Sequence, residues 1–437
     1  MADSMADSPP DDTSWQTVLA FASIPVVASL IGYCTNVLAI QMTFLPLEYV
    51  GFFEPAFRQI GFSLGWQGII PANAAKIAEK AVTIITTQLI TVDEIFSRID
   101  AHKLAQLTRK PLRKALDRVI EQVATQHFPD VWESLPLVAR SELADKAAEI
   151  AEPYICDMVE TLHERVHEVL DLHALSVEKL LEDKELMNEV FKRCGDAEFR
   201  FIEISGLYFG FLLGIAQAAL WWLLLSVRSS LDDPSSLPLG WYLPVAGALC
   251  GYVTNNIALG VIFNPIEPIE FFGFTVQGLF LQRQKEVSRE FATICASRVV
   301  TAASCWENIL YGRNRAVFAG IVTQHVCRAI DEQVGLLRPL VPLVVGSTNF
   351  HAAKMQAAAL LLEELPACLV ATYAYTEEAM DMQRVLTTRM QRLPSASFER
   401  VLHPAFEDDE WKLILVGGLL GLFVGIFQLV FVFGSQI

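Results

Sequence analysis

Charged residues are scarce in this sequence. Asp, Glu, Lys and Arg make up 19% of its 437 residues, against about 25% in an average soluble protein. Hydrophobic residues make up 53%, and the excess lies in four long apolar runs. About 20 apolar residues are enough for a helix to cross the hydrocarbon core of a bilayer. The composition therefore predicts an integral membrane protein.

Positive charge is scarcer than negative charge. The chain has 33 Lys and Arg residues against 50 Asp and Glu residues, which gives a net charge of −17. Binding to nucleic acid depends on clustered Lys and Arg that neutralise phosphates, so the balance argues against a nucleic-acid partner. The eight cysteines form no Cys-x-x-Cys pair, which argues against a disulfide framework and fits a reducing compartment.

The apolar runs cover about residues 15–45, 205–227, 239–264 and 411–433. We expect each to be a transmembrane helix, and the first to be retained, because no positive segment of a signal peptide precedes it. Residues 55–200 and 274–409 carry charges and apolar residues at helical spacing, so both should be amphipathic helical domains. Residues 1–14 are expected to be a disordered acidic tail, and residues 229–238 a linker. The predicted fold class is all-α.

Two stretches of the chain match each other. The sequence Gly-Tyr-Cys-Thr-Asn-Val-Leu-Ala-Ile at 32–40 recurs as Gly-Tyr-Val-Thr-Asn-Asn-Ile-Ala-Leu at 251–259. Further along, Gly206, Gly210, Gly214 and Gln217 match Gly417, Gly421, Gly425 and Gln428 at a constant offset. Such matches indicate an internal duplication. We predict two parallel repeats, 15–228 and 239–437, each with a helical domain between two spans.

The repeat arrangement also predicts a topology. Two spans return the chain to its starting side, so both helical domains should lie on one face of the membrane. Lys and Arg residues gather near that face, whereas Arg228 is the basic residue of the opposite face; the first group is Arg58, Lys76, Lys192, Arg193, Arg200, Arg283 and Lys285. This bias predicts cytoplasmic helical domains. The sequence leaves the membrane itself open, and an endomembrane location is a working hypothesis.

The repeated motif resembles that of a known family. Gly-Tyr-x-Thr-Asn-x-x-Ala-(Ile/Leu)-x-x-x-Phe-x-Pro is similar to the opening motif of the bacterial YheB-type (UPF0754-like) membrane proteins, the family labelled domain of unknown function 445. Residues 68–71, 282–285 and 406–414 resemble its further blocks. The sequence departs from the family at residues 72–75, where basic residues are usual, and at Leu281, where Pro is usual. The resemblance implies a membrane protein with helical cytoplasmic parts and no particular activity.

Polar side chains interrupt the predicted spans. They are Thr35, Asn36, Gln217, Thr254, Asn255 and Gln428. An unpaired amide in hydrocarbon is costly, so these groups should face other helices. One interpretation is interhelical hydrogen bonding, and the other is a polar path of the kind that transporters with repeats use. No charged residue lies deep in a span, which favours the first interpretation.

The matching glycines predict how the spans pack. Gly206, Gly210 and Gly214 are four residues apart and share one helix face, as do Gly417, Gly421 and Gly425. Small residues at this spacing let two helix backbones approach closely. We expect the second span to pack on the first and the fourth on the third, with each Gln near an Asn.

Residues 163–167 have the form His-Glu-x-x-His, in which two zinc ligands and a general base share a helix face. However, Leu170 occupies the position where metzincins have Gly, and the second repeat has no His pair. The helix already has an apolar stripe that includes Leu162 and Val166, which makes His163 and His167 part of its solvated flank. We interpret the match as fortuitous and predict no catalytic residue, metal ligand or cofactor.

The leading functional hypothesis is a non-enzymatic membrane scaffold or tether whose helical domains bind a protein partner or lipid. The alternative is a transporter or lipid-moving protein with a polar path near Asn36 and Asn255. A zinc hydrolase that uses His163 and His167 is a distant third hypothesis. The sequence leaves the oligomeric state open.

Overall fold

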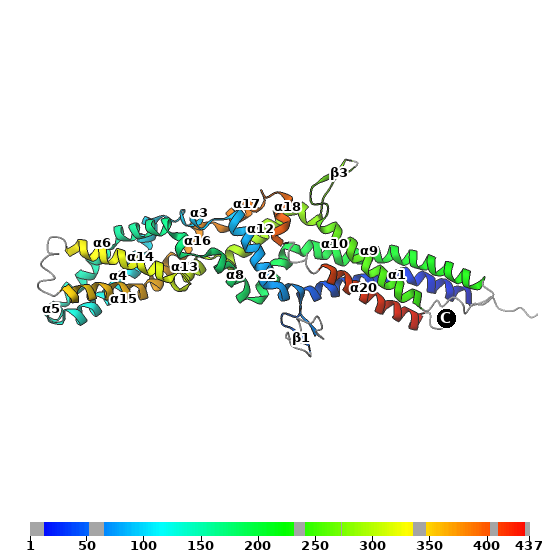
Figure 1. Ribbon diagram of the computed structural model, residues 1–437, viewed down its shortest axis with the longest axis horizontal. Helices are drawn as coiled ribbons and strands as arrows, with labels where there is room; N and C mark the ends of the chain where they lie inside the picture. The colour runs from blue at the N-terminus through cyan, green and yellow to red at the C-terminus, as the bar shows by residue number, and fades with distance from the viewer. Residues whose placement is uncertain are drawn as a thin grey trace, which may run out of the picture. The chain divides into compact units, whose positions relative to one another are not determined.

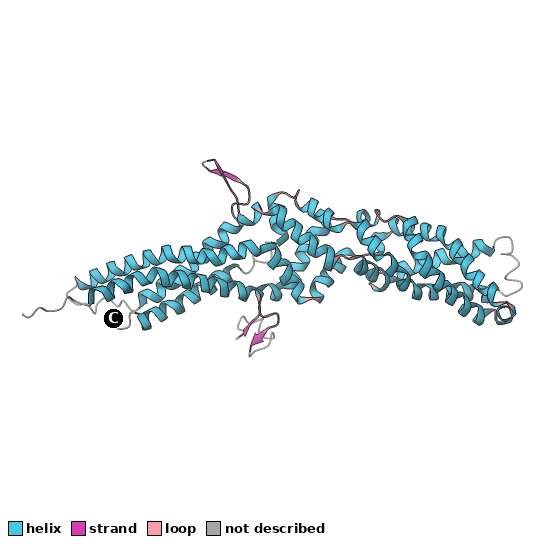
Figure 2. Cartoon of the chain, turned by 180° about the vertical axis from the view of Figure 1, so that it is seen from behind, coloured by secondary structure: helices cyan, strands magenta, loops and turns pink. Residues whose placement is uncertain are grey.

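The computed structural model describes residues 13–51, 65–230, 241–271, 273–334, 347–402 and 410–432. Most of the predicted acidic tail and linker, Arg58 and residues 406–409 lie outside these ranges. The described chain is helical apart from two short hairpins (Figure 2), whose strands are too short to leave an alternating pattern. The predicted all-α class is confirmed.

The chain forms two compact units, and each combines segments from both halves of the sequence. The membrane unit comprises Met1–Ala81, Asp183–Glu290 and Gln391–Ile437. The helical unit comprises Val82–Glu182 and Phe291–Met390. The two segments predicted as helical domains of separate repeats therefore contribute to one unit.

Four long helices build the membrane unit. They are α1 (Thr13–Phe44), α9 (Lys184–Ser229), α10 (Tyr242–Phe263) and α20 (Glu410–Phe427), which continues into the π-helical turn η9 (Gln428–Val432). Helix α1 packs along α9, and α10 packs along α20 (Figure 1). Contacts of α10 with α9 and of α1 with α20 join the two pairs.

By length and composition, four helices could cross a membrane: Phe21–Phe44, Lys184–Arg228, Tyr242–Phe263 and Thr348–Met390. The second contains the predicted second span, and the first and third lie within the predicted first and third spans. The predicted fourth span falls on α20, whose apolar part Ile414–Val430 is shorter. We assign Thr348–Met390 to the helical unit, because a left-handed residue, Asp381, interrupts it and its helices pack on amphipathic neighbours.

The second span is part of a longer helix than predicted. Asp183 caps α9 with its side chain, which accepts hydrogen bonds from the backbone N–H groups of Glu185 and Leu186. No Pro follows before Ser229, so the polar beginning and the apolar run form one helix of 46 residues. Such a helix is longer than a bilayer core requires.

A similar order of elements follows α1 and α10, with one helix before the π-helical turn in the first case and two in the second. After α1 come β1 (Val50–Gly51), β2 (Gly65–Trp66), α2 (Ile69–Ile84), the π-helical turn η2 (Ile85–Leu89) and α3 (Val92–Phe96). After α10 come β3 (Ile269–Phe271), β4 (Phe274–Val276), α11 (Leu279–Gln282), α12 (Gln284–Ile294), the π-helical turn η5 (Cys295–Val299) and α13 (Ala302–Tyr311). Thr91 caps α3 and Thr301 caps α13 through their side chains.

An antiparallel four-helix bundle forms most of the helical unit. Its helices are α4 (Ala101–His127), α6 (Leu137–Glu164), α14 (Arg315–Val334) and α15 (Ser347–Leu369). Each packs on two others in the order α4, α6, α14, α15 (Figure 1). The sequence of α4 illustrates why these helices pack together. Its buried residues recur every three or four positions and make one face that packs on the neighbouring helices; they include Leu104, Thr108, Leu112, Ala115 and Val119.

Shorter helices complete the two units. In the helical unit these are α5 (Pro129–Ser134), α7 (Val166–Val169), α8 (Leu172–Glu182), η8 (Val370–Thr372), α16 (Tyr373–Met380) and α17 (Met382–Met390). In the membrane unit, α18 (Ser395–Leu402) packs on α11.

Candidate functional site

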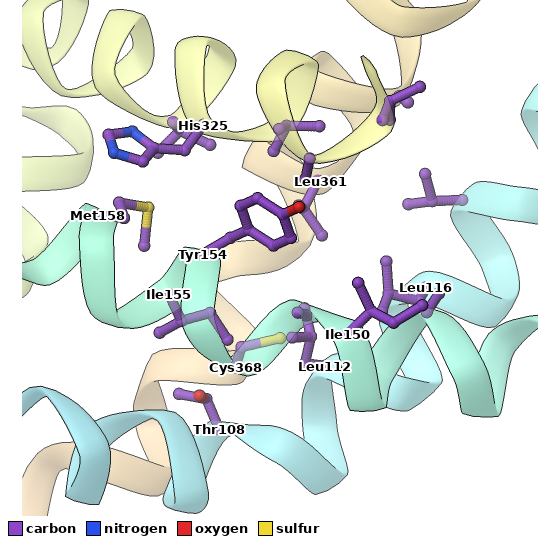
Figure 3. A pocket seen from close by; sticks show the side chains of 18 of the residues that line it. Thr108, Leu112, Leu116, Ile150, Tyr154, Ile155, Met158, His325, Leu361 and Cys368 are labelled. Atoms are coloured by element: carbon purple, nitrogen blue, oxygen red, sulfur yellow. The ribbon is translucent and has the colours of Figure 1, made fainter. Parts of the chain in front are cut away.

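A cavity of about 590 Å³ runs along the core of the four-helix bundle (Figure 3). This volume lies within the range that is usual for small-molecule sites. Its lining extends from Leu104 to Ile120 on α4 and from Leu143 to Met158 on α6, with further residues of α14 and α15. At about 1.5 Å per residue, the lining is roughly 18–24 Å long.

The lining of this bundle cavity is almost wholly apolar. Leu112, Leu116, Ile150, Ile155 and Leu361 point toward its interior (Figure 3). Small side chains explain the space, because four alanines stand where larger aliphatic residues would fill a bundle core: Ala147, Ala151, Ala329 and Ala357. The cavity therefore suits a long apolar ligand.

Three polar residues of the lining, Thr108, Tyr154 and His325, already bond to protein groups. Tyr154 donates a hydrogen bond from its hydroxyl to Oε2 of Glu332 at 2.8 Å. The His325 ring lies 2.8 Å from the Ile321 carbonyl oxygen, and the Thr108 hydroxyl donates to a carbonyl of its own helix. Polar atoms of a ligand would thus gain little inside this cavity.

Two further lining residues bear on its chemistry. Burial raises the pKa of Cys368 to about 11, so its thiol is protonated at neutral pH and is a poor nucleophile. Lys146 is exposed and is the one charged residue among the described residues that line the cavity. An ammonium group at this position can meet the polar end of a ligand whose apolar part lies in the cavity.

In the membrane unit, both predicted asparagines lie against glycines of the neighbouring span. Asn36 is 1% exposed and donates from Nδ2 to the carbonyl oxygen of Ile202 on α9 at 2.6 Å. A Cβ at Gly206 would come within 2.9 Å of Asn36 Nδ2. Asn255 is also buried, and its amide would collide with a Cβ at Gly417.

All six predicted glycines lie at the contacts within the two helix pairs. A Cβ at Gly210 would lie 2.6 Å from the Ala28 carbonyl oxygen, and one at Gly214 would lie 2.6 Å from Pro25 Cα. On the other pair, Gly421 faces Gly247, and a Cβ at Gly425 would lie 2.5 Å from Pro244 Cα. Real Cβ atoms do not approach other atoms so closely, so the helices could not pack at these distances with larger residues.

Five of the six predicted polar residues line one small cavity between the four spans. The cavity measures about 30 Å³, and Thr35, Asn36, Gln217, Thr254 and Gln428 contribute to its lining. Gln217 and Asn36 share this cavity, whereas Asn255 is not part of the lining. Thr35 and Thr254 donate to carbonyl oxygens of their own helices, Gly32 and Cys250, and these two bonds do not link different helices.

The His-Glu-x-x-His stretch does not lie on one helix. Helix α6 ends at Glu164, and Arg165 leaves the helical conformation with φ −119° and ψ 18° before α7 begins. His163 is partly buried, which lowers its pKa, while His167 is exposed and lies 3.7 Å from Asp93. Among the described residues, no three His, Cys, Asp or Glu side chains could hold a metal ion together.

The ion pair of Glu198 and Arg283 in the membrane unit was not predicted. Glu198 on α9 has a side chain that is 5% exposed, and its Oε2 accepts a hydrogen bond from Arg283 Nη1 at 2.7 Å. Arg283 also pairs with Glu286, and these carboxylates raise the pKa of Arg283. The basic residues at 282–285 were noted in the sequence, but nothing in the sequence identified Glu198 as their partner.

Comparison with known proteins bears on the predicted family. The family described as "Protein of unknown function (DUF445)" matches residues 26–190. The predicted resemblance is confirmed. A relative named UPF0754 membrane protein alr5253, from Nostoc sp., is 22% identical over 470 residues, covering 98% of this chain and 99% of the relative. No solved structure matches the chain. With the apolar helices described above, we conclude that the chain is a multi-pass membrane protein.

Proposed function

We propose that this membrane protein binds the acyl chain of a lipid in the bundle cavity of its helical unit, while its spans anchor it in the bilayer. The observation that carries the proposal is the apolar cavity of about 590 Å³. The proposal makes the protein a non-enzymatic lipid-binding protein and narrows the hypothesis of a scaffold or tether to one ligand class. The Lys and Arg bias of the sequence supports a cytoplasmic position for this unit.

The dimensions of the cavity favour an acyl chain over a compact ligand. The lining follows several helical turns of each bundle helix, so the ligand should be long and narrow. Each buried CH₂ group contributes about 0.8 kcal/mol, so about ten of them would give roughly 8 kcal/mol. This corresponds to micromolar affinity before the ordering costs are subtracted.

The membrane unit gives less support to transport. The polar cavity between the spans has a volume of about 30 Å³, which has room for one or two water molecules. Glycine contacts close the space around it, because Gly210 and Gly421, which line the cavity, lie against the neighbouring helices. A solute path at Asn36 and Asn255 would require these helices to separate.

Ligand-dependent stabilisation tests the proposal. The full chain, transferred from detergent to amphipol, should gain thermal stability when a long-chain fatty acid is added, by about 2.7 kcal/mol at 100 times its Kd. Ala357→Phe places a large side chain in the bundle cavity and should abolish this gain. Ala359→Phe is the matched control, because Ala359 is exposed on the same helix and does not line the cavity. Equal gains in both variants, or no gain in the unsubstituted protein, would refute acyl-chain binding.

A further inference from the structure

The small polar cavity between the spans has a composition that suits a bound molecule. Side chains from all four helices of the membrane unit contribute to it: Thr35 and Asn36 from α1, Gln217 from α9, Cys250 and Thr254 from α10, and Val424 from α20 with Gln428 just beyond it. A cavity needs about 10–15 Å³ to hold one water molecule. The volume of about 30 Å³ therefore admits one or two.

Gln217 is the residue that indicates an occupant. Its side chain is 8% exposed, and its Nε2 has no hydrogen-bond partner among the residues that the structure describes. Its backbone carbonyl oxygen accepts a hydrogen bond from the Tyr242 hydroxyl at 3.0 Å, but this bond does not involve the side chain. A buried amide without a partner is costly, so an acceptor in the cavity would stabilise the packed helices.

The lining of the same cavity contains further hydrogen-bonding groups, among them Thr35 and Thr254. The Thr35 and Thr254 hydroxyls donate to carbonyl oxygens of their own helices, which leaves their oxygen atoms able to accept. A water molecule can accept from Gln217 Nε2 and donate to such oxygens. It would thus find the two to four polar partners that buried water requires.

An ion fits this cavity less well than water. No Asp, Glu, Lys or Arg occurs in its lining, so an ion would be buried without a counter-charge, which is strongly unfavourable. A neutral molecule with both donor and acceptor capacity is the ligand class that the lining selects. At this volume, that molecule is water.

We propose that the polar cavity binds one or two ordered water molecules, held by Gln217 Nε2, and that these molecules link the four spans of the membrane unit. The polar cavity lies in the membrane unit and would bind a polar molecule, whereas the bundle cavity lies in the helical unit and has an apolar lining. It does not depend on acyl-chain binding.

A cysteine elsewhere in the spans serves as an internal control. Cys250 belongs to the lining of the polar cavity, whereas Cys34 on α1 does not. Cys34 is the more exposed of the two residues, so exposure alone would favour oxidation of Cys34 over oxidation of Cys250.

X-ray radiolysis of the full chain in nanodiscs tests the proposal, because hydroxyl radicals formed from bound water oxidise adjacent side chains and cysteine is readily oxidised. Cys250 should be oxidised at doses several-fold lower than Cys34, although Cys34 is the more exposed residue, and in H₂¹⁸O the incorporated oxygen should be labelled. Gln217→Leu removes the amide donor without adding an oxidisable sulfur, and it should reduce Cys250 oxidation to the level of Cys34. Equal oxidation of the two cysteines in the unsubstituted protein would overturn the proposal, whether or not the variant assembles. Unchanged Cys250 oxidation in an assembled Gln217→Leu protein would overturn the role of Gln217.

Discussion

Asn36 on α1 donates a hydrogen bond from Nδ2 to the carbonyl oxygen of Ile202 on α9, over a distance of 2.6 Å. The two residues are 166 positions apart in the chain, so the bond joins the first and second spans directly. Gly206 lies beside the same amide, and the absence of a Cβ there leaves room for it. The Asn in the apolar run is therefore explained by a contact between helices.

Replacement of Asn36 should weaken the pairing of α1 with α9. We expect Asn36→Leu to destabilise the membrane unit by about 0.6–2 kcal/mol, the range measured for interhelical hydrogen bonds in membranes. Leu38→Ala is a suitable control, because Leu38 is 42% exposed on the same helix. Its replacement should lower the free energy of unfolding less than Asn36→Leu does. Unfolding titrations in mixed micelles measure both variants, and equal effects would show that the Asn36 bond contributes little.

Neighbouring glycines of α20 should respond differently to the same substitution. A Cβ at Gly417 would overlap with Asn255 and the backbone of Gly251, whereas a Cβ at Gly418 would meet its nearest atom at 3.5 Å, an ordinary contact. Gly417→Ala should therefore separate α10 from α20 and lower the melting temperature. Gly418→Ala should leave the melting temperature unchanged. If the two variants have the same melting temperature, the close approach of α10 and α20 at Gly417 is not important for stability.

The helical unit should lose stability below about pH 6.5, the ordinary pKa of histidine. Burial lowers the pKa of His163 in the folded protein. At acidic pH, His163 is therefore protonated more readily in the unfolded chain than in the folded chain, and this difference favours unfolding. Stability is then fully present above the unfolded pKa and falls as the pH drops through it. Chemical unfolding of the full chain at pH 5 and pH 7.5 measures this loss. His163→Gln should reduce the difference, and His167→Gln should not, because His167 is exposed.

The ion pair of Glu198 and Arg283 should contribute more than the pair of Arg283 and Glu286. Glu198 is 5% exposed and Glu286 is 53% exposed, and removal of one partner from a buried pair costs about 3–5 kcal/mol. Because Arg283 is itself partly exposed and keeps Glu286, we expect Glu198→Ala to cost somewhat less, about 2 kcal/mol. Glu286→Ala should cost under 1 kcal/mol, as for surface pairs. Unfolding titrations in mixed micelles measure the free energy of unfolding of both variants. A larger loss for Glu286→Ala than for Glu198→Ala would contradict the prediction that the buried pair contributes more.

The sequence predicted the features that depend on local composition. Apolar runs predicted the first three spans, and the four-residue spacing of Gly206, Gly210 and Gly214 predicted a shared helix face; in the structure these glycines lie close to α1. The predicted fourth span falls on α20, whose apolar part Ile414–Val430 is short, whereas Thr348–Met390 is long and apolar enough to cross a membrane but was predicted as part of an amphipathic domain. Composition alone does not separate a short span from a buried bundle helix.

The features that depend on distant pairs could not be predicted from the sequence. Arg118 on α4 pairs with Glu364 on α15, 246 residues away, and such contacts place helices of both halves in one bundle. The sequence showed amphipathic faces but not which faces meet. The bundle cavity was missed for the same reason, because it arises where Ala151 of α6 and Ala357 of α15 line the same core, a relationship that neither helix shows alone.

Photo-crosslinking with a diazirine-labelled fatty acid tests acyl-chain binding most directly. The full chain would be reconstituted in vesicles that contain the probe, illuminated, and digested for mass spectrometry. We predict adducts on cavity-lining residues of the bundle, such as Leu112, Ile150 and Leu361, in addition to adducts on exposed residues of the spans, such as Leu212. Unlabelled fatty acid should compete away the bundle adducts and leave the span adducts. Adducts confined to the spans would contradict the proposal that the helical unit binds lipid.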